Sequence, residues 1–179
     1  MPAARHLSSQ LCMSCGLCCQ GLLHPNTALE PKEVPAARKL GFQIIDHDGP
    51  AFPQPCVKFE RCCTIYERRP QACVGYKCAL LRKLEAGDIQ FDVAMNTVAE
   101  AHRLIGEAAD CVPDGQLVSE FRAHLTKSAR PASSDGNAPL RRLRMTALGV
   151  FLDKHFVRDK ARKFFSSLAV DTTPEEGVR

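Results

Sequence analysis

Apolar positions follow different patterns in the two halves of the chain, and the change comes near residue 80. Before that point apolar runs are short and are interrupted by prolines and glycines, which is typical of loop-rich structure. After it, apolar residues recur at three- and four-residue steps, the spacing of amphipathic helices. The sequence therefore predicts a mainly α protein with little β structure.

The second half of the chain, residues 81–179, is predicted to be a helical region that packs on the first half. Proline, serine, glycine and asparagine gather at 130–139, which indicates a linker within it. The apolar pattern predicts a helix that begins near Leu80 and stops at Gly87-Asp88, a longer helix over 93–108, a third over 116–128 and a last one over 140–168.

The first half, residues 1–80, gives weaker structural signals, because prolines and glycines confine each element to a few residues. With few core hydrophobics, this half is expected to take its stability from bound metal rather than from a large core. In chain order we predict a poorly ordered arm over 1–10, a short helix over 36–40, a strand over 42–45, a turn at 48–50, extended chain to Cys56, and a short helix that opens near Pro70 and carries Cys73.

Cysteine is unusually frequent in this loop-rich half. Four of the ten cysteines fall within Cys12–Cys19, here named the first cysteine motif; five more lie in Cys56–Cys78, the second cysteine motif, and Cys111 stands alone. The N-terminus has no apolar stretch of the secretory kind, and no apolar run approaches the roughly 18 residues of a membrane span. We therefore expect a cytoplasmic protein with no membrane segment. In that reducing compartment, CxxC spacing favours a metal site over disulfides.

Clustered thiolates can close a tetrahedral zinc site or hold an iron–sulfur cluster, and cysteine alone does not choose between them. The neighbours Cys18 and Cys19 point in different directions in either a helix or a strand, so they rarely grip one ion together. One of them is expected to serve a second centre, to bridge two metals, or to remain as a reactive thiol. The second cysteine motif has enough ligands to share such a site.

Charge adds a further expectation, although the formal net charge of +4 is too small to indicate nucleic-acid binding. Several thiolates carry more negative charge than one or two divalent ions cancel, so cationic side chains should lie near them. The last predicted helix is also basic and would suit an unidentified protein partner, but a solvated polar face explains it more simply. The cationic residues interleaved with the second cysteine motif are Lys58, Arg61, Arg68, Arg69 and Lys77.

The order and spacing of both motifs resemble a known family. The chain reads Cys12-x-x-Cys15-x-x-Cys18-Cys19, then Cys56, then Cys63-x-Ile65-Tyr66-x-x-Arg69-Pro70-x-x-Cys73 and Cys78. This resembles the CxxCxxCC family of zinc- or iron-chelating domains, also called YkgJ-family cysteine cluster proteins, over residues 12–78. Family members are described as binding an iron–sulfur cluster or zinc, and a flagellin lysine methylase is similar in this domain.

The resemblance implies eight metal ligands and leaves Cys62 and Cys111 outside the pattern. Tyr66 and Arg69 flank the cysteines of the second motif. We expect the Arg69 guanidinium to bond loop carbonyls or to offset thiolate charge, and so to support the cofactor without ligating it. The implied ligands are Cys12, Cys15, Cys18, Cys19, Cys56, Cys63, Cys73 and Cys78.

Residues outside the pattern are given structural roles. His24 is expected in a surface loop, although it lies close enough to the first motif to replace a cysteine ligand. Cys111 is expected to be a small core residue. Three further histidines have no partner residues at the spacing of metal ligands and are also expected to have structural roles: His102, His124 and His155.

The function predicted from the sequence is metal binding through the eight cysteines, with an iron–sulfur cluster favoured over zinc. No phosphate loop, dinucleotide fingerprint, GxSxG elbow or HExxH helix is present, so no catalytic motif exists beyond the metal site. The alternatives are a metal-dependent redox or protein-modifying enzyme of methylase type, and a metal chaperone or sensor.

Overall fold

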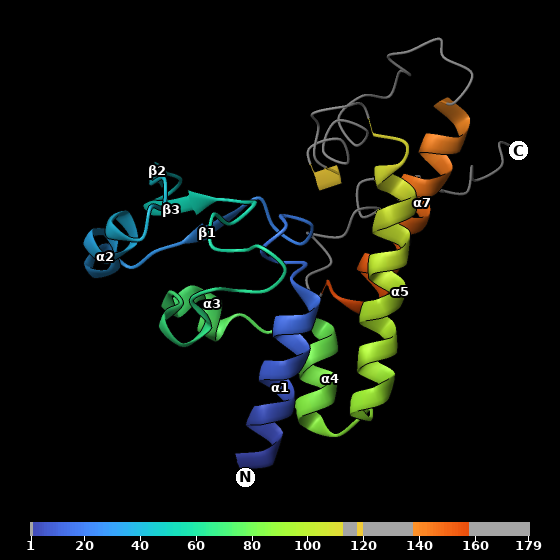
Figure 1. Cartoon of the computed structure of the whole chain (residues 1–179), viewed down its shortest axis with the longest axis horizontal. Helices are drawn as coiled ribbons and strands as arrows, with labels where there is room; N and C mark the ends of the chain where they lie inside the picture. The colour runs from blue at the N-terminus through green and yellow to red at the C-terminus, as the bar shows by residue number, and fades with distance from the viewer. Residues whose placement is uncertain (1, 113–117, 120–137, 158–179) are drawn as a thin grey trace, which may run out of the picture.

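The computed structural model describes residues 2–112, 118–119 and 138–157 of the chain. Its long helices pack side by side as a helical layer, and a small sheet with two short helices projects from one side of that layer (Figure 1). The helical layer consists of α1 (Pro2–Cys15), α4 (Ala79–Ala86), α5 (Phe91–Ala109) and α7 (Ala138–His155).

The projecting part, here named the sheet lobe, is built on three short antiparallel strands in the order β1-β3-β2. Thr27 pairs with Phe52, and Ile45 pairs with Ala51, so the central strand lies between the other two. The elements of the lobe are β1 (Asn26–Ala28), a 3-10 helix (Pro31–Glu33), α2 (Val34–Lys39), β2 (Ile45–Asp46), β3 (Pro50–Pro53), a 3-10 helix (Tyr66–Arg68) and α3 (Gln71–Gly75).

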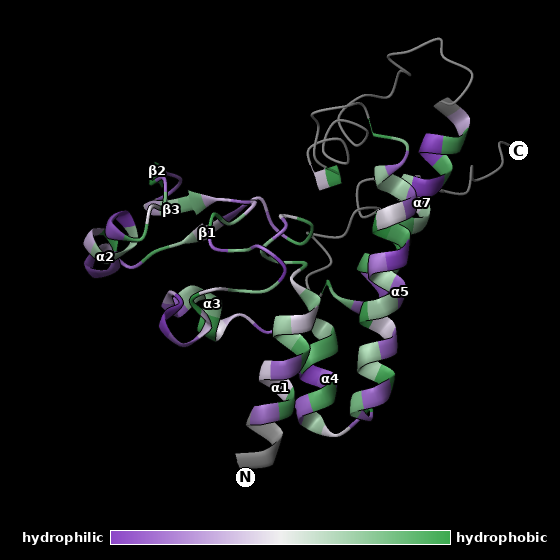
Figure 2. Cartoon of the chain, viewed as in Figure 1, coloured by the Kyte–Doolittle hydropathy of each residue, from purple (hydrophilic) through white to green (hydrophobic). Residues whose placement is uncertain are grey.

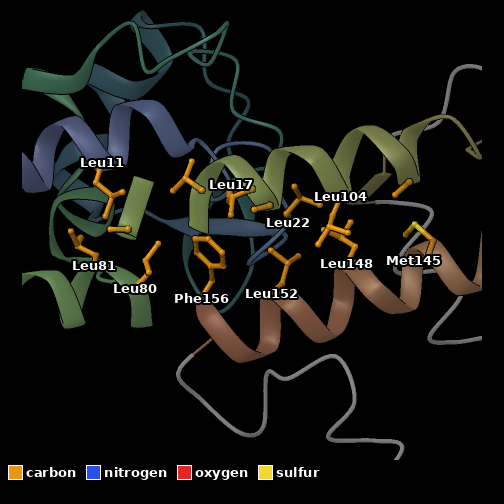
Figure 3. Close-up of a cluster of buried hydrophobic side chains, with 14 residues drawn as sticks. Leu11, Leu17, Leu22, Leu80, Leu81, Leu104, Met145, Leu148, Leu152 and Phe156 are labelled. Atoms are coloured by element: carbon orange, nitrogen blue, oxygen red, sulfur yellow. The ribbon is translucent and has the colours of Figure 1, made fainter. Parts of the chain in front are cut away.

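The main core lies within the helical layer and takes residues from both ends of the chain. Leu17 and Leu22, which follow α1, lie together with Leu152 and Phe156 of the α7 region (Figure 3). Along α5 apolar and polar residues alternate with helical spacing, so one side of the helix faces this core (Figure 2). The backbone N–H of Ala79 donates to the carbonyl of Phe156 at 3.0 Å, which fixes the start of α4 against the end of α7.

A second, smaller core lies within the sheet lobe. The rings of Phe42 and Phe52 pack against each other at a tilt of 54° with centroids 4.5 Å apart, and Leu29, Ala37 and Ile65 are buried around them. Within the described part of the chain, no helix is long and apolar enough to cross a membrane. The described residues thus form two hydrophobic cores, one in the helical layer and one in the sheet lobe.

The predicted fold class, mainly α with little β, is confirmed, and so are the helices expected near 80–86, over 93–108 and after Pro70. The expectation of a poorly ordered arm over 1–10 is wrong, because residues 2–10 belong to α1. Local periodicity did not reveal this helix; its last turns are held by packing of Leu11 against the core. The extended, proline-rich segment is the central strand β3, where Ala51 and Phe52 are both 1% exposed.

Two further predictions differ in extent or lie beyond the description. The predicted strand over 42–45 is present only as Ile45–Asp46. The last helix begins at Ala138, inside the predicted linker, and ends at His155. The predicted helix over 116–128 falls almost entirely outside the described residues, as do residues 158–168. The division of the chain into 1–80 and 81–179 stays a prediction, although α1 packs with α4 and α5.

Candidate metal centre

A cavity lies between the helical layer and the sheet lobe, with an empty volume of ≈990 Å³, part of which is open solvent. All eight cysteines of the sequence pattern line it, whereas Cys62 and Cys111 do not. The structure thus brings two distant motifs to one place. The lining thiols belong to Cys12, Cys15, Cys18, Cys19, Cys56, Cys63, Cys73 and Cys78.

The first cysteine motif is the last turn of α1 together with the turn that follows it. Cys12 and Cys15 are three positions apart in the helix and therefore share a face. Gly16 then leaves the helix with a φ of +63°, and its carbonyl accepts from the backbone N–H of Gln20 at 3.0 Å. Leu17, 0% exposed, anchors this turn in the main core.

A contact from α5 also holds this turn. The Nε2 of His102 lies 2.7 Å from the carbonyl oxygen of Cys15 and hydrogen-bonds to it. His102 is thus a structural residue, as expected, and it ties the end of α1 to α5. His155 is also structural, with its ring 4.5 Å from that of Phe151, while His124 lies outside the described residues.

The second cysteine motif runs through the last part of the sheet lobe and returns to the helical layer. The backbone N–H of Cys56 donates to the carbonyl of Cys19 at 2.8 Å, which joins the two motifs directly. Cys73 lies in α3, whose first backbone N–H, that of Gln71, donates to the Glu33 carboxylate at 2.9 Å. The last cysteine, Cys78, caps the N-terminus of α4, because its Sγ accepts from the backbone N–H of Leu81 at 3.4 Å.

Burial dominates the acid–base behaviour of these thiols. It raises the pKa of Cys12 to about 11 and those of Cys15, Cys19 and Cys73 to about 12, and repulsion between neighbouring thiolates adds to the effect. Burial likewise raises the pKa of Cys18 well above its ordinary value. Since these thiols are protonated at neutral pH, a metal ion would bind them by displacing protons.

Tyr66 and Arg69 both line the cavity, and both act on Cys12. The Arg69 guanidinium carbon stands 3.6 Å from the centre of the Tyr66 ring, a cation–π contact. The charge of Arg69 lowers the pKa of Cys12 and Cys73, and a hydrogen bond from the Tyr66 hydroxyl also lowers that of Cys12. Arg69 Nε is buried with no hydrogen-bond partner among the described residues, so charge compensation is the better supported of its two expected roles.

The other cations of the second motif contribute unequally. Burial raises the pKa of Cys56, and Lys58 opposes this rise through its backbone N–H, which donates to the Cys56 thiol at 3.4 Å, and to a smaller extent through its charge. Lys77 is instead paired with Glu85 at 2.6 Å, and Arg61 and Arg68 are exposed. The expectation that cations crowd the thiols therefore holds for Arg69 and Lys58.

The cavity is also lined by polar residues that were not predicted as site residues, among them His24, Tyr76 and Gln54. His24 was expected on the surface, but it is half-buried, lines the cavity and packs edge-on against Tyr76 with ring centroids 5.2 Å apart. Its closeness to the first motif in sequence was the available signal. No sequence signal pointed to Tyr76 or Gln54, which the fold brings to the cavity from the second motif and from the end of β3.

Cys111 does not belong to either core. It is half-buried after the end of α5, and its thiol accepts a hydrogen bond from Arg144 Nη1 of α7 at 3.2 Å. The same guanidinium nitrogen donates to the carbonyl of Glu107 at 2.9 Å. Cys111 thus helps to join α5 and α7, away from the cavity.

The donor set fits soft or borderline metals, since thiolate sulfur is the ligand that zinc and iron–sulfur clusters share. Within the described residues, no group of three or more His, Cys, Asp or Glu side chains already has the geometry to hold one metal ion. The thiols therefore line one cavity, but no three of them are arranged around the position of a single metal ion.

A family model, CxxCxxCC, matches residues 11–100, half of the chain. The chain belongs to the CxxCxxCC family. The description of the family is "Putative zinc- or iron-chelating domain", and the matched region covers both cysteine motifs, the sheet lobe, α4 and the first half of α5. No curated protein and no solved structure matches the chain. Membership in the CxxCxxCC family thus supports metal chelation by zinc- or iron-type chemistry, without choosing the metal.

Proposed function

We propose that this protein is a cytoplasmic metal-binding protein whose eight cysteines hold an iron–sulfur cluster or zinc, with the iron–sulfur form favoured. One observation carries the proposal: all eight cysteines of the pattern line one cavity, and the two cysteines outside the pattern do not. Buried structural thiols would have no reason to gather in this way from α1, the sheet lobe and the start of α4.

Spacing between the thiols supports the iron–sulfur form. With zinc–sulfur bonds of about 2.3 Å, the sulfurs of a tetrahedral zinc site lie about 3.8 Å apart. No three of the cysteine side chains converge on one ion in this way. A polynuclear cluster spans a wider space than a bare ion, so it suits thiols that do not converge on one point.

The protein would tune such a group through residues that do not ligate it. A bound cluster or ion would supply redox or Lewis-acid chemistry. Arg69 would offset the negative charge of the thiolates, and Tyr66 would hold both the guanidinium and Cys12 in place. The apolar walls around the thiols lower the local dielectric constant, which strengthens both contacts.

Anaerobic purification followed by analysis of iron, zinc and acid-labile sulfide per chain tests this proposal. We expect iron and sulfide in similar amounts and a coloured protein. A colourless protein that holds zinc without sulfide would overturn the iron–sulfur preference, and a protein without bound metal would overturn the proposed function.

The shape of the cavity favours one second candidate, a redox or protein-modifying enzyme. Tyr66, Tyr76 and His24 line the cavity together with the thiols, and part of the cavity is open to solvent, so a substrate group could reach a metal bound there. A basic surface on α7, where Arg142 and Lys154 are exposed, would suit an acidic protein as partner. Binding of a candidate protein substrate that perturbs the visible spectrum of the metal would support this candidate, whereas an unchanged spectrum at saturation would count against it.

A further inference from the structure

The cysteines of the cavity rest on two different hydrophobic cores. Cys12, Cys15 and Cys78 pack against the main core of the helical layer, at the end of α1 and the start of α4. These two helices are packed together, which explains why residues far apart in sequence meet there. Three other cysteines, Cys56, Cys63 and Cys73, pack instead against the core of the sheet lobe.

The adjacent pair Cys18 and Cys19 stands at the boundary between the two cores. Cys18 directly follows Leu17, which is fully buried in the main core. The carbonyl of Cys19 accepts from the backbone N–H of Cys56 at 2.8 Å, so Cys19 is tied to the sheet lobe. The backbone therefore assigns one member of the pair to each side, as their diverging side-chain directions require.

We propose that the cavity holds two separate four-thiol metal centres, and this inference rests on the proposed function that the cysteines bind metal. Four thiolates complete the coordination of one zinc ion or one iron–sulfur cluster, so each group is sufficient by itself. The helical group is Cys12, Cys15, Cys18 and Cys78. The sheet group is Cys19, Cys56, Cys63 and Cys73.

Stepwise removal of metal tests the division on the intact protein. The metal-loaded chain is treated with a chelator, and samples are taken for native mass spectrometry and for cysteine alkylation mapped residue by residue. We expect a populated species with one centre, in which the four thiols of one group are alkylated together while the other four stay protected. A single step in which all eight thiols become reactive together would overturn the division while leaving the proposed function intact.

Variants provide the second test, with loading by Co²⁺ alone as the probe. Cys12→Ser should lose about half of the bound Co²⁺ and leave the sheet group protected from alkylation, and Cys73→Ser should do the reverse. Cys62→Ser is the matched control, because Cys62 neighbours Cys63 yet does not line the cavity. This variant should bind as much Co²⁺ as the unmodified chain. Loss of all Co²⁺ in both Cys12→Ser and Cys73→Ser, with an intact control, would contradict two separate centres. Absence of Co²⁺ and of any other metal from the unmodified chain would instead refute the proposed function.

Discussion

Gly16 is the residue at which the first cysteine motif turns out of α1. Its φ of +63° suits glycine, and a Cβ placed there would overlap the ring of Phe59. Gly41 offers a matched control, since its φ of +83° is similar but a Cβ would meet nothing within 4 Å. A comparison of alanine substitutions at the two positions therefore distinguishes the effect of the left-handed backbone from that of crowding against Phe59.

We predict that Gly16→Ala lowers metal content and thermal stability much more than Gly41→Ala. The control should cost about 1 kcal/mol, the price of the left-handed conformation alone. In Gly16→Ala the ring of Phe59, which lies between Cys56 and Cys63 in the chain, must also move. Metal analysis and thermal unfolding of both variants would check this, and equal losses would show that crowding by Phe59 is unimportant.

Arg69 is a cation of the second cysteine motif whose charge acts on the pKa of two cavity thiols. Arg69→Gln removes a charge that lowers the pKa of Cys12 and Cys73, so both thiolates become harder to form. We expect metal affinity to fall by roughly 10- to 100-fold, as for other residues that support metal ligands. Competition with a chelator would measure it. Arg68→Gln, an exposed neighbour, should leave affinity unchanged; a similar loss there would point to a general effect of surface charge.

The raised thiol pKa values also predict how the metal-free protein responds to pH. Folded thiols with a pKa near 11 or 12, above their ordinary value of 9.0, keep their stabilising effect below about pH 9 and lose it as the pH rises. Urea unfolding of the metal-free chain should therefore show falling stability above about pH 9. The Cys15→Ser variant should show a smaller fall, and an equal fall would assign the effect to other groups.

At the scale of elements, α1 is the helix that the sequence analysis did not predict. Its residues lack a clear amphipathic period, and its last turns depend on Leu11 packing against partners that come later in the chain. By contrast, α4 was predictable because it has apolar spacing and Gly87 ends it in the left-handed conformation. Local rules thus predicted the helices with a clear apolar period, and did not predict α1 or the strand β1, whose packing partners lie elsewhere in the chain.

Leu17 links α1 and the cavity to the main core, which gives a prediction for packing. Leu17→Ala should destabilise the protein by about 2–5 kcal/mol, because the residue is 0% exposed and its loss leaves a cavity. It should also reduce metal content, since Leu17 anchors the turn between Cys15 and Cys18. Leu143→Ala, at 65% exposure, is the control and should change stability by less than about 0.5 kcal/mol. Denaturant unfolding measures both, and a small effect at Leu17 would show that the turn does not depend on it.

At the scale of the whole molecule, the resemblance to the CxxCxxCC family implied the eight cysteines that line the cavity. The diverging directions of the neighbours Cys18 and Cys19 predict that one of them serves a second centre, bridges two metals or remains a reactive thiol. The sequence could not show which thiols lie on which core, because that depends on the packing of α1 against α4 and on the position of the sheet lobe. For the same reason His24 and Tyr76 were not assigned to the site.

The two cores also predict what removal of metal does. The helical layer has a substantial core of its own and should keep its helices, whereas the sheet lobe rests on a small core and should lose its order. Hydrogen exchange with and without a chelator would locate the change. We expect exchange to rise in β1, β3 and α3 and to change little in α5. Unchanged exchange in the sheet lobe would mean that metal does not hold it.

The central claim is that cysteine sulfur from both motifs surrounds the metal. X-ray absorption at the edge of the bound metal tests this most directly, because it measures the first coordination shell in the intact protein. The account predicts a shell of sulfur alone, near 2.3 Å if the metal is zinc. A shell that contains nitrogen or oxygen at about 2.0–2.1 Å, as from His24 or a carboxylate, would contradict it.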